Sequence, residues 1–159
     1  MTKPIPLDSD LWVKDLWGGV DDPRPELREL VAADKPTSKS VEDLLDGLYY
    51  VDFPAPQFFF AIPYLIEIFE SDTANQIPAI NQFCQYMHKC KEGKPQQKYL
   101  NHFESNRKRI FDLLVKCISL SDGKGYYVHK ELIAGLATAC GESDLGRQII
   151  GLSSDTPIN

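Results

Sequence analysis

The sequence has no apolar run long enough to cross a membrane. Its longest uninterrupted apolar segment, Phe58 to Ile66, has nine residues and is followed at once by Glu67, whereas a bilayer-spanning helix needs roughly twenty. The opening stretch, MTKPIPLDSDLW, has no apolar core and no small-residue cleavage site, so no signal peptide is expected. We therefore expect a cytoplasmic protein with no membrane partner.

Catalytic and cofactor motifs are also lacking. Residues 123–125 read GKG, but the phosphate-loop pattern G-x-x-x-x-G-K-[ST] between a strand and a helix is not present, so this stretch is interpreted as an interhelical turn. His102 and His129 could serve as general bases near neutral pH, and Glu131 lies close to His129 in the sequence. Nothing in the spacing places Cys117 or Cys140 beside His129. We expect no enzymatic activity and no cofactor.

The cysteines do not form a convincing metal site. Cys84 and His88 lie one helical turn apart, and thiolate with imidazole suits zinc. Cys90, however, lies about 240° around a helix from Cys84, and a fourth ligand is missing nearby. The stretch is interpreted as a core stripe with a histidine at its edge, without a metal. Because no export signal is present and most cysteines fall on apolar stripes, free buried thiols are favoured over disulfides for Cys84, Cys90, Cys117 and Cys140.

What the sequence does contain is a helical pattern. The chain has 159 residues, 43% hydrophobic and 25% charged, which fits one globular domain. Period-two alternation is nearly absent, whereas apolar residues recur at helical spacing. The predicted class is all-α. The expected helices lie within residues 7–17 and 26–33, from a Ser40 N-cap to 50, over 55–70, 78–91 and 96–120, around 132–140, and over 144–152 with Ser143 as a cap.

The helices over 55–70 and 78–91 carry aromatic residues on more than one side, as expected for helices packed between two neighbours. Short connections between helices favour antiparallel hairpins. Pro63 falls inside the 55–70 helix, and an interior proline bends a helix at a cost of about 3 kcal/mol. A bundle and a short solenoid both agree with this pattern, and the breadth of the apolar faces favours stacked layers.

The stretch from Leu44 to Phe69 resembles a known family. The segment AIPYLIEIF at 61–69 is similar to the "A-x-P-[FY]-L-x-x-[LIF]" helix of a bacterial subset of HEAT-like, armadillo-type helical repeats. The matching residues are Ala61, Pro63, Tyr64, Leu65 and Phe69. The resemblance covers residues 40–140 loosely and implies a short stack of antiparallel helical hairpins. Small proteins of this kind often occur as immunity proteins of bacterial toxin systems, which implies a non-catalytic binding function.

The resemblance and the linker KPTSKS lead to three segments. Residues 1–36 are expected to form a helical extension that docks on the core. Residues 37–152 are expected to form the HEAT-like domain, and residues 153–159 a flexible tail.

Charge is distributed unevenly along the chain. Residues 1–80 carry 15 acidic and 6 basic side chains, a charge of −9, whereas residues 81–159 carry 8 acidic and 11 basic, a charge of +3. An acidic surface with exposed aromatics is suited to rapid capture of a basic partner, and tyrosine and tryptophan are favoured as interface anchors. The predicted partner-binding residues are Trp12, Trp17, Asp21, Asp22, Asp46, Tyr49, Tyr50, Asp52 and Phe53. Alternatively, the aromatics dock the N-terminal helices on the core.

The leading hypothesis is an immunity protein that neutralises a basic bacterial toxin by direct binding. An adaptor or subunit of a larger assembly is a second possibility. A third is a nucleic-acid-binding repeat, in which phosphates would contact the basic groups Lys89, Lys91, Lys94, Lys98, Arg107, Lys108 and Arg109. The sequence pI of about 5.0 argues against nucleic acid.

Overall fold

Helices make up nearly all of the regular structure. The computed structural model describes residues 3–14, 21–50, 53–90, 95–120 and 126–152. Within these ranges the chain forms eight helices and one two-residue antiparallel strand pair, so the all-α prediction is confirmed. The helices are α1 (Leu11–Lys14), α2 (Arg24–Ala32), α3 (Ser38–Gly47), α4 (Pro56–Ser71), α5 (Ile77–Met87), α6 (Gln97–Leu120), α7 (Tyr126–Ala139) and α8 (Ser143–Gly151), and the strands are β1 (Tyr49–Tyr50) and β2 (Phe53–Pro54).

Helices α2, α3, α4 and α5 begin where a backbone amide hydrogen of the first turn, which has no partner within the helix, is either absent or capped by a side chain. Proline lies in the first turn of α2, α4 and α5, where it has no amide hydrogen to satisfy. Helix α3 is capped by Thr37, whose Oγ1 accepts from the Ser40 amide at 3.2 Å. The prediction of Ser40 as the N-cap is therefore wrong, because Ser40 is already helical and supplies the donor. The Ser143 cap is wrong too, since Ser143 is the first residue of α8 and the N-cap residue is Glu142.

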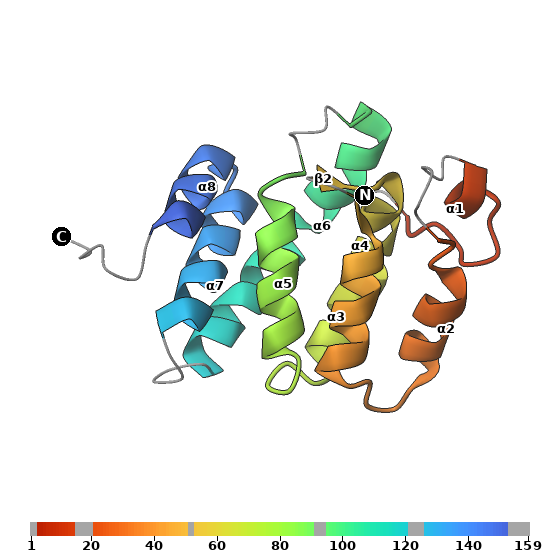
Figure 1. The fold of residues 1–159 in the computed structure, drawn as a ribbon, viewed down its shortest axis with the longest axis horizontal. Helices are drawn as coiled ribbons and strands as arrows, with labels where there is room; N and C mark the ends of the chain where they lie inside the picture. Colours follow the sequence, from red (N-terminus) through yellow and green to blue (C-terminus); the bar gives the residue numbers. More distant parts are fainter. Residues whose placement is uncertain (1–2, 15–20, 51–52, 91–94, 121–125, 153–159) are drawn as a thin grey trace.

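The helices pack in two sets. Helix α4 lies between α2 and α6, and α5 lies between α3 and α7. Further contacts join α2 to α3 and α6 to α7, and α8 packs against α7. Figure 1 looks onto the α3 and α5 side, with α1 and α2 at one end and α8 at the other. Helices α2, α4 and α6 therefore form one layer, and helices α3, α5 and α7 form the other.

Helix α4 supplies the centre of the core, and its three consecutive phenylalanines contact both α5 and α6. Phe58 stacks on Phe83 of α5 with ring centroids 5.5 Å apart. Phe60 meets Tyr99 and His102 of α6 edge-on, at 5.5 and 5.4 Å. All three phenylalanines are buried. The expectation of aromatics on more than one side of this helix is confirmed.

Pro63 lies inside α4, and the helix is continuous from Pro56 to Ser71. Proline has no amide hydrogen to donate to the carbonyl of Phe59, four residues earlier, and the cost is about 3 kcal/mol. Burial of α4 on several sides offsets this cost. The bend at Pro63 stays a prediction.

Two glycines allow helices to approach closely. A Cβ at Gly135 of α7 would lie 2.4 Å from Cys84 Sγ of α5. A Cβ at Gly146 of α8 would lie 2.5 Å from Thr138 Oγ1 and 2.8 Å from the carbonyl oxygen of Ala134, both on α7. Side chains at these positions would push α7 and α8 away from their neighbours.

The N-terminal region shares the core with the rest of the molecule. Trp12, Leu27 and Leu30 belong to the same buried cluster as Leu132 and Ala139 of α7. Within the described residues, no helix combines the length and apolarity that crossing a bilayer requires. The predicted tail, residues 153–159, lies outside the described residues.

Candidate protein-binding face

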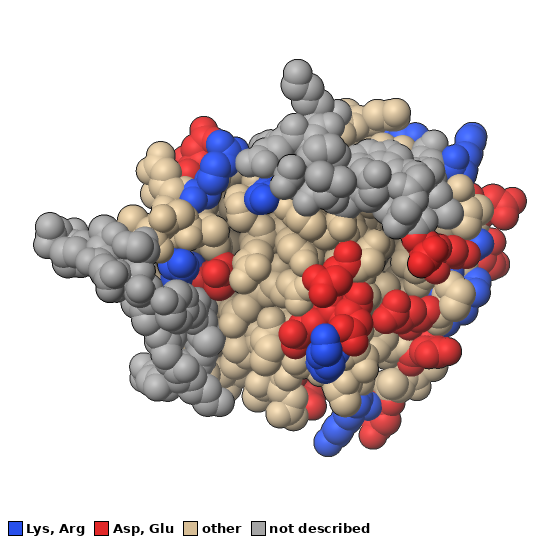
Figure 2. All heavy atoms as spheres, in the orientation of Figure 1, with Lys and Arg blue, Asp and Glu red and all other residues tan. Residues whose placement is uncertain are grey.

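Carboxylates gather around a hollow between α2 and α3. Glu26 and Glu29 are exposed on α2, one helical turn apart, and Asp43 is exposed on α3. Together they border a hollow of about 320 Å³ whose remaining lining is Leu30, Ala33, Pro36 and Ser40. In Figure 2 acidic side chains gather over the α2 and α3 side of the viewed face, whereas the area over α5 is largely uncharged. The lining of the hollow thus combines three carboxylates with the apolar residues Leu30, Ala33 and Pro36.

The carboxylates of this hollow repel one another. Burial raises the pKa of Glu26, and the negative charges of Asp43 and Glu29 raise it further. Asp43 also pairs with Lys39, but both side chains of that pair are more than half exposed, so solvent screens the attraction. A cation from a partner would relieve the repulsion.

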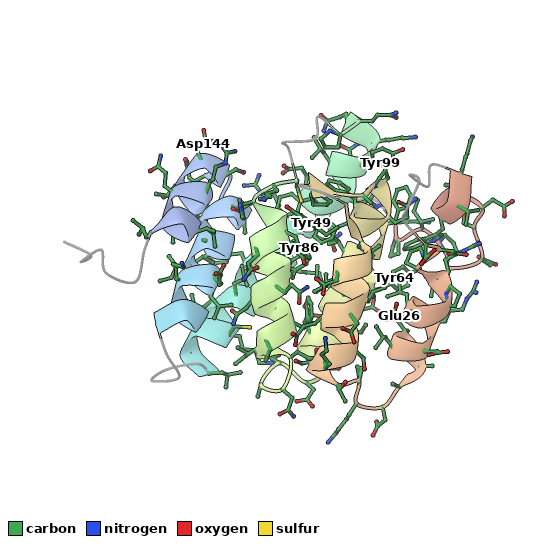
Figure 3. All side chains as sticks on the ribbon, viewed as in Figure 1. Glu26, Tyr49, Tyr64, Tyr86, Tyr99 and Asp144 are labelled. Atoms are coloured by element: carbon green, nitrogen blue, oxygen red, sulfur yellow. The ribbon has the colours of Figure 1, made fainter. Side chains whose placement is uncertain are left out.

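A tyrosine pair lies beside the acidic residues, between α3 and α5 (Figure 3). The rings of Tyr49 and Tyr86 stack with centroids 4.0 Å apart and an interplanar angle of 16°. The Lys89 ammonium lies 5.6 Å from the centre of the Tyr49 ring, within the range of a cation–π contact. The pair presents aromatic surface that is only partly buried.

Asp46 joins the tyrosine pair to α3. The Tyr86 hydroxyl donates to Asp46 Oδ1 at 2.6 Å, and the Gln82 amide also donates to Asp46. Burial and the bond to the Asp46 carboxylate raise the pKa of Tyr86 to about 12. The tyrosine therefore stays protonated and donating at every physiological pH. We call Glu26, Glu29, Glu42, Asp43, Asp46, Tyr49 and Tyr86 the acidic face.

The structure brings together only some of the predicted residues. Asp46 and Tyr49 meet through Tyr86, as described. Trp12 is fully buried, so it cannot be an exposed anchor and instead holds the N-terminal segment on the core. Asp22 binds the Arg24 guanidinium at 2.8 Å, and that hydrogen bond lowers the pKa of Asp22. Asp21 is exposed near the start of α2.

The remaining predicted residues lie partly or wholly outside the described structure. The backbones of Tyr50 and Phe53 pair across the β1–β2 hairpin, but their side chains are not described. Trp17 and Asp52 are outside the described residues altogether. Their place in a binding face stays a prediction.

The predicted partner-binding residues did not include five residues of the acidic face, Glu26, Glu29, Glu42, Asp43 and Tyr86, or the neighbouring Gln82. Glu26 and Glu29 have the i, i+3 spacing that places two side chains on one helix face, and this signal was available. Gln82 and Tyr86 have the same kind of signal at i, i+4 on α5. Their contact with Asp46 spans about 40 residues of sequence, and no local pattern indicates it.

The basic run of α6 has acidic or carbonyl partners. Arg107 bonds to Glu104 at 2.9 Å and donates to the Ala139 carbonyl at the end of α7. The other two cations form the pairs Lys108–Asp112 and Arg109–Glu70, at 2.6 and 2.7 Å. Much of the positive charge expected on this helix is therefore neutralised within the chain.

The cysteines and histidines contribute mainly to packing. Cys84, Cys90 and Cys117 are buried free thiols, whereas Cys140 is exposed and does not belong to a buried stripe. Burial raises the pKa of Cys84 well above its usual range and lowers that of His102. Among the residues that the structure describes, no three His, Cys, Asp or Glu side chains are placed to hold a metal ion. The side chain of His129 is not described.

Comparisons with protein-family models, with curated proteins and with solved structures gave no match. The fold and the acidic face are therefore the basis for assigning a function.

Proposed function

We propose that this chain is a non-catalytic, HEAT-like protein-binding domain that captures a basic protein on its acidic face. The observation that carries the proposal is the carboxylate-rimmed hollow of Glu26, Glu29 and Asp43, beside the stacked pair of Tyr49 and Tyr86. The carboxylates attract a basic partner over distance and raise the association rate. The tyrosines then supply contact area at the interface.

The layered packing supports the HEAT-like class. In a stack of helical hairpins, the first helices of successive hairpins pack on one another, and so do the second helices. The series α2–α4–α6 and α3–α5–α7 have this arrangement. The resemblance of residues 61–69 to a HEAT-like helix agrees with it.

The most concrete form of the proposal is an immunity protein that neutralises a bacterial toxin. Toxins that act on nucleic acids are usually basic, so an inhibitor with an acidic face has complementary charge. Binding would cover the active site or the nucleic-acid-binding surface of the toxin. Protein inhibitors of this kind bind without bond chemistry, which agrees with the absence of catalytic motifs from the sequence.

A charge-neutralised variant tests the proposal. The triple variant Glu26→Gln, Glu29→Gln, Asp43→Asn removes three negative charges from the face. A matched control, Glu104→Gln, Asp112→Asn, Asp144→Asn, removes the same charge from α6 and α8. Each tagged chain would be used to capture partners from its native host, and association rates would be measured with the purified partner.

The wild-type chain and the control are expected to retain one small basic protein at near-equal stoichiometry. The face variant is expected to associate about tenfold more slowly, and the difference should shrink in high salt. Equal association of the face variant and the control would refute the acidic face. Recovery of a large multi-subunit assembly would favour an adaptor, and retention of duplex DNA at physiological salt would favour a nucleic-acid-binding repeat.

A further inference from the structure

Residues 3–14, which we call the strap, lie on the fold in the manner of a bound peptide. The strap is anchored by apolar side chains: Trp12 is fully buried, and Ile5 and Leu7 pack against the core. The Trp12 ring meets Phe60 edge-on at 5.6 Å and lies 6.2 Å from the ring of Tyr64. A large aromatic anchor of this kind is typical of a binding hot spot.

The strap backbone is held by side chains of α2 and α4. Tyr64 Oη donates to the Ile5 carbonyl at 2.7 Å, and Gln57 Nε2 donates to the Trp12 carbonyl at 3.0 Å. From α2, Arg28 donates to the Leu7 carbonyl, and Arg24 donates to the Ser9 carbonyl at 3.2 Å. Side chains on two helices thus capture backbone carbonyls along the whole strap.

One acidic residue of the strap interacts favourably with an arginine of α2. Arg24 and Arg28 lie on the α2 side, and Asp10 of the strap adds to the electrostatic stabilisation of the Arg24 cation. Asp22 binds two guanidinium nitrogens of Arg24 at 2.8–3.0 Å and so fixes the direction of its remaining donor. Residues 3–14 carry two acidic and two basic side chains and so have no net charge. The surface is built for a short segment with one deeply buried aromatic residue.

Four hydrogen bonds hold the strap backbone, and each runs from a side chain of α2 or α4 to a backbone carbonyl of the strap. The same contacts can therefore form when the strap comes from another molecule with the same sequence. The connecting residues 15–20 include Gly18 and Gly19. We propose that the α2–α4 surface is a peptide-binding site that accepts residues 3–14 of a second copy of this chain, so that two copies exchange straps. The proposal is independent of the function assigned to the acidic face.

In a single chain the strap has a large advantage over any free competitor. A short linker gives an effective concentration on the order of millimolar. Binding between molecules is therefore measured best when the internal strap is weakened and the surface is left intact. The variant Trp12→Ala of the full-length chain does this, because Trp12 lies in the strap and its partners Phe60 and Tyr64 lie in α4.

The first experiment measures binding of a fluorescent peptide with the sequence of residues 3–14. The peptide should bind full-length Trp12→Ala at least tenfold more tightly than the wild-type chain, because the wild-type site is already occupied. Adding Arg28→Ala to this variant should weaken peptide binding about tenfold through the lost hydrogen bond. Adding Arg147→Ala, on an exposed arginine of α8, is the matched control and should leave binding unchanged.

The second experiment tests whether one full chain donates its strap to the surface of another. One chain carries Trp12→Ala and keeps a good receiving surface. The other carries Arg24→Ala with Arg28→Ala and keeps a good strap. Each alone should be monomeric by light scattering, and their mixture should form a one-to-one dimer at micromolar concentrations. A mixture that stays monomeric, with a peptide that does not bind Trp12→Ala, overturns the proposal.

A cleavable chain keeps the test decisive if Trp12→Ala fails to fold. A protease site inserted between Gly18 and Gly19 of the full-length chain allows the strap to be cut after folding. The labelled peptide should then replace the cut strap, as measured by native mass spectrometry. If the peptide stays unbound and loss of the strap leaves the melting temperature unchanged, the strap is not a ligand of the surface.

Discussion

Two regions of the molecule contain aromatic and acidic residues: the N-terminal strap with the α2 residues that hold it, and the acidic face. Trp12 and Asp22 near the strap are more buried than Glu26 and Asp43 of the acidic face. Near the strap, the indole of Trp12 is buried and the carboxylate of Asp22 is bound by Arg24. On the acidic face, Glu26 and Asp43 border an open hollow, and their charges disfavour each other. The aromatic ring and the carboxylate near the strap are held by buried or partly buried contacts, whereas the paired groups of the acidic face remain largely open to solvent. Residue type alone does not distinguish a structural contact from a binding surface.

The largest difference between the two regions should appear when a buried anchor is removed. Trp12→Ala is expected to lower the free energy of unfolding by about 3–5 kcal/mol, because a fully buried indole leaves a cavity. The neighbouring Leu11 is 45% exposed, so Leu11→Ala should change stability by about 0.5 kcal/mol or less. Urea titration followed by circular dichroism measures both. Similar losses in the two variants would contradict the assignment of Trp12 as the anchor.

Removing one hydroxyl from each region gives a smaller and more selective contrast. Tyr64→Phe should cost about 1 kcal/mol, because the partly buried Ile5 carbonyl loses its donor. Tyr86→Phe should cost less, about 0.5 kcal/mol, because water can replace the hydroxyl at the exposed Asp46. Thermal unfolding of the two variants in one buffer tests this order. A larger loss for Tyr86→Phe would make the tyrosine pair a structural element.

The carboxylate near the strap should stabilise the fold at neutral pH. The Arg24 hydrogen bond lowers the folded-state pKa of Asp22 below the ordinary value of 3.8. Its stabilising contribution is therefore present above pH 3.8 and is lost as the pH falls through the lower folded-state pKa. Asp22→Asn should lower stability at pH 7 by less than about 1 kcal/mol, since the pair is partly exposed. Urea titrations at pH 7 and below pH 3 should show that the difference disappears in acid.

Removing the carboxylate charge of Glu26 on the acidic face should change the folding stability in the opposite direction, and by the smallest amount. The folded-state pKa of Glu26 is raised above the ordinary value of 4.5. Its favourable contribution is present below pH 4.5 and is lost as the pH rises through the folded-state pKa. At pH 7, Glu26→Gln should therefore raise stability by a few tenths of a kcal/mol at about the scale of exposed charge pairs. The same pair of urea titrations measures it, and a loss of stability at pH 7 would contradict the repulsion inferred here.

The helices could be predicted well because their cause is local. Apolar stripes at helical spacing mark α4, α5 and α6, and turn residues separate them. The residue at which each helix begins was harder to predict from the sequence. Thr37 and Ser40 are both good capping residues, and only the backbone conformation decides that Thr37 accepts and Ser40 donates.

The candidate site was predictable only in part, because packing between helices assembles it. Asp46 and Tyr49 lie in a stretch that is acidic and aromatic in the sequence itself. Glu26 joins them on one face only because α2 packs beside α3. The adjacent residues Leu11 and Trp12 are both plausible anchors in the sequence, and the way the strap docks decides that Leu11 is exposed and Trp12 is buried.

Helix α4 has a consequence for how the molecule opens. Phe60 of α4 contacts Trp12 of α1 and also α6, and Phe58 of α4 contacts α5, so the helix is covered on several sides. Amide hydrogens of such a central helix exchange only when the whole fold opens, whereas a segment held by side chains can detach by itself. We therefore expect amide hydrogens of the strap to exchange faster than those of α4, because α4 is protected until the whole fold opens.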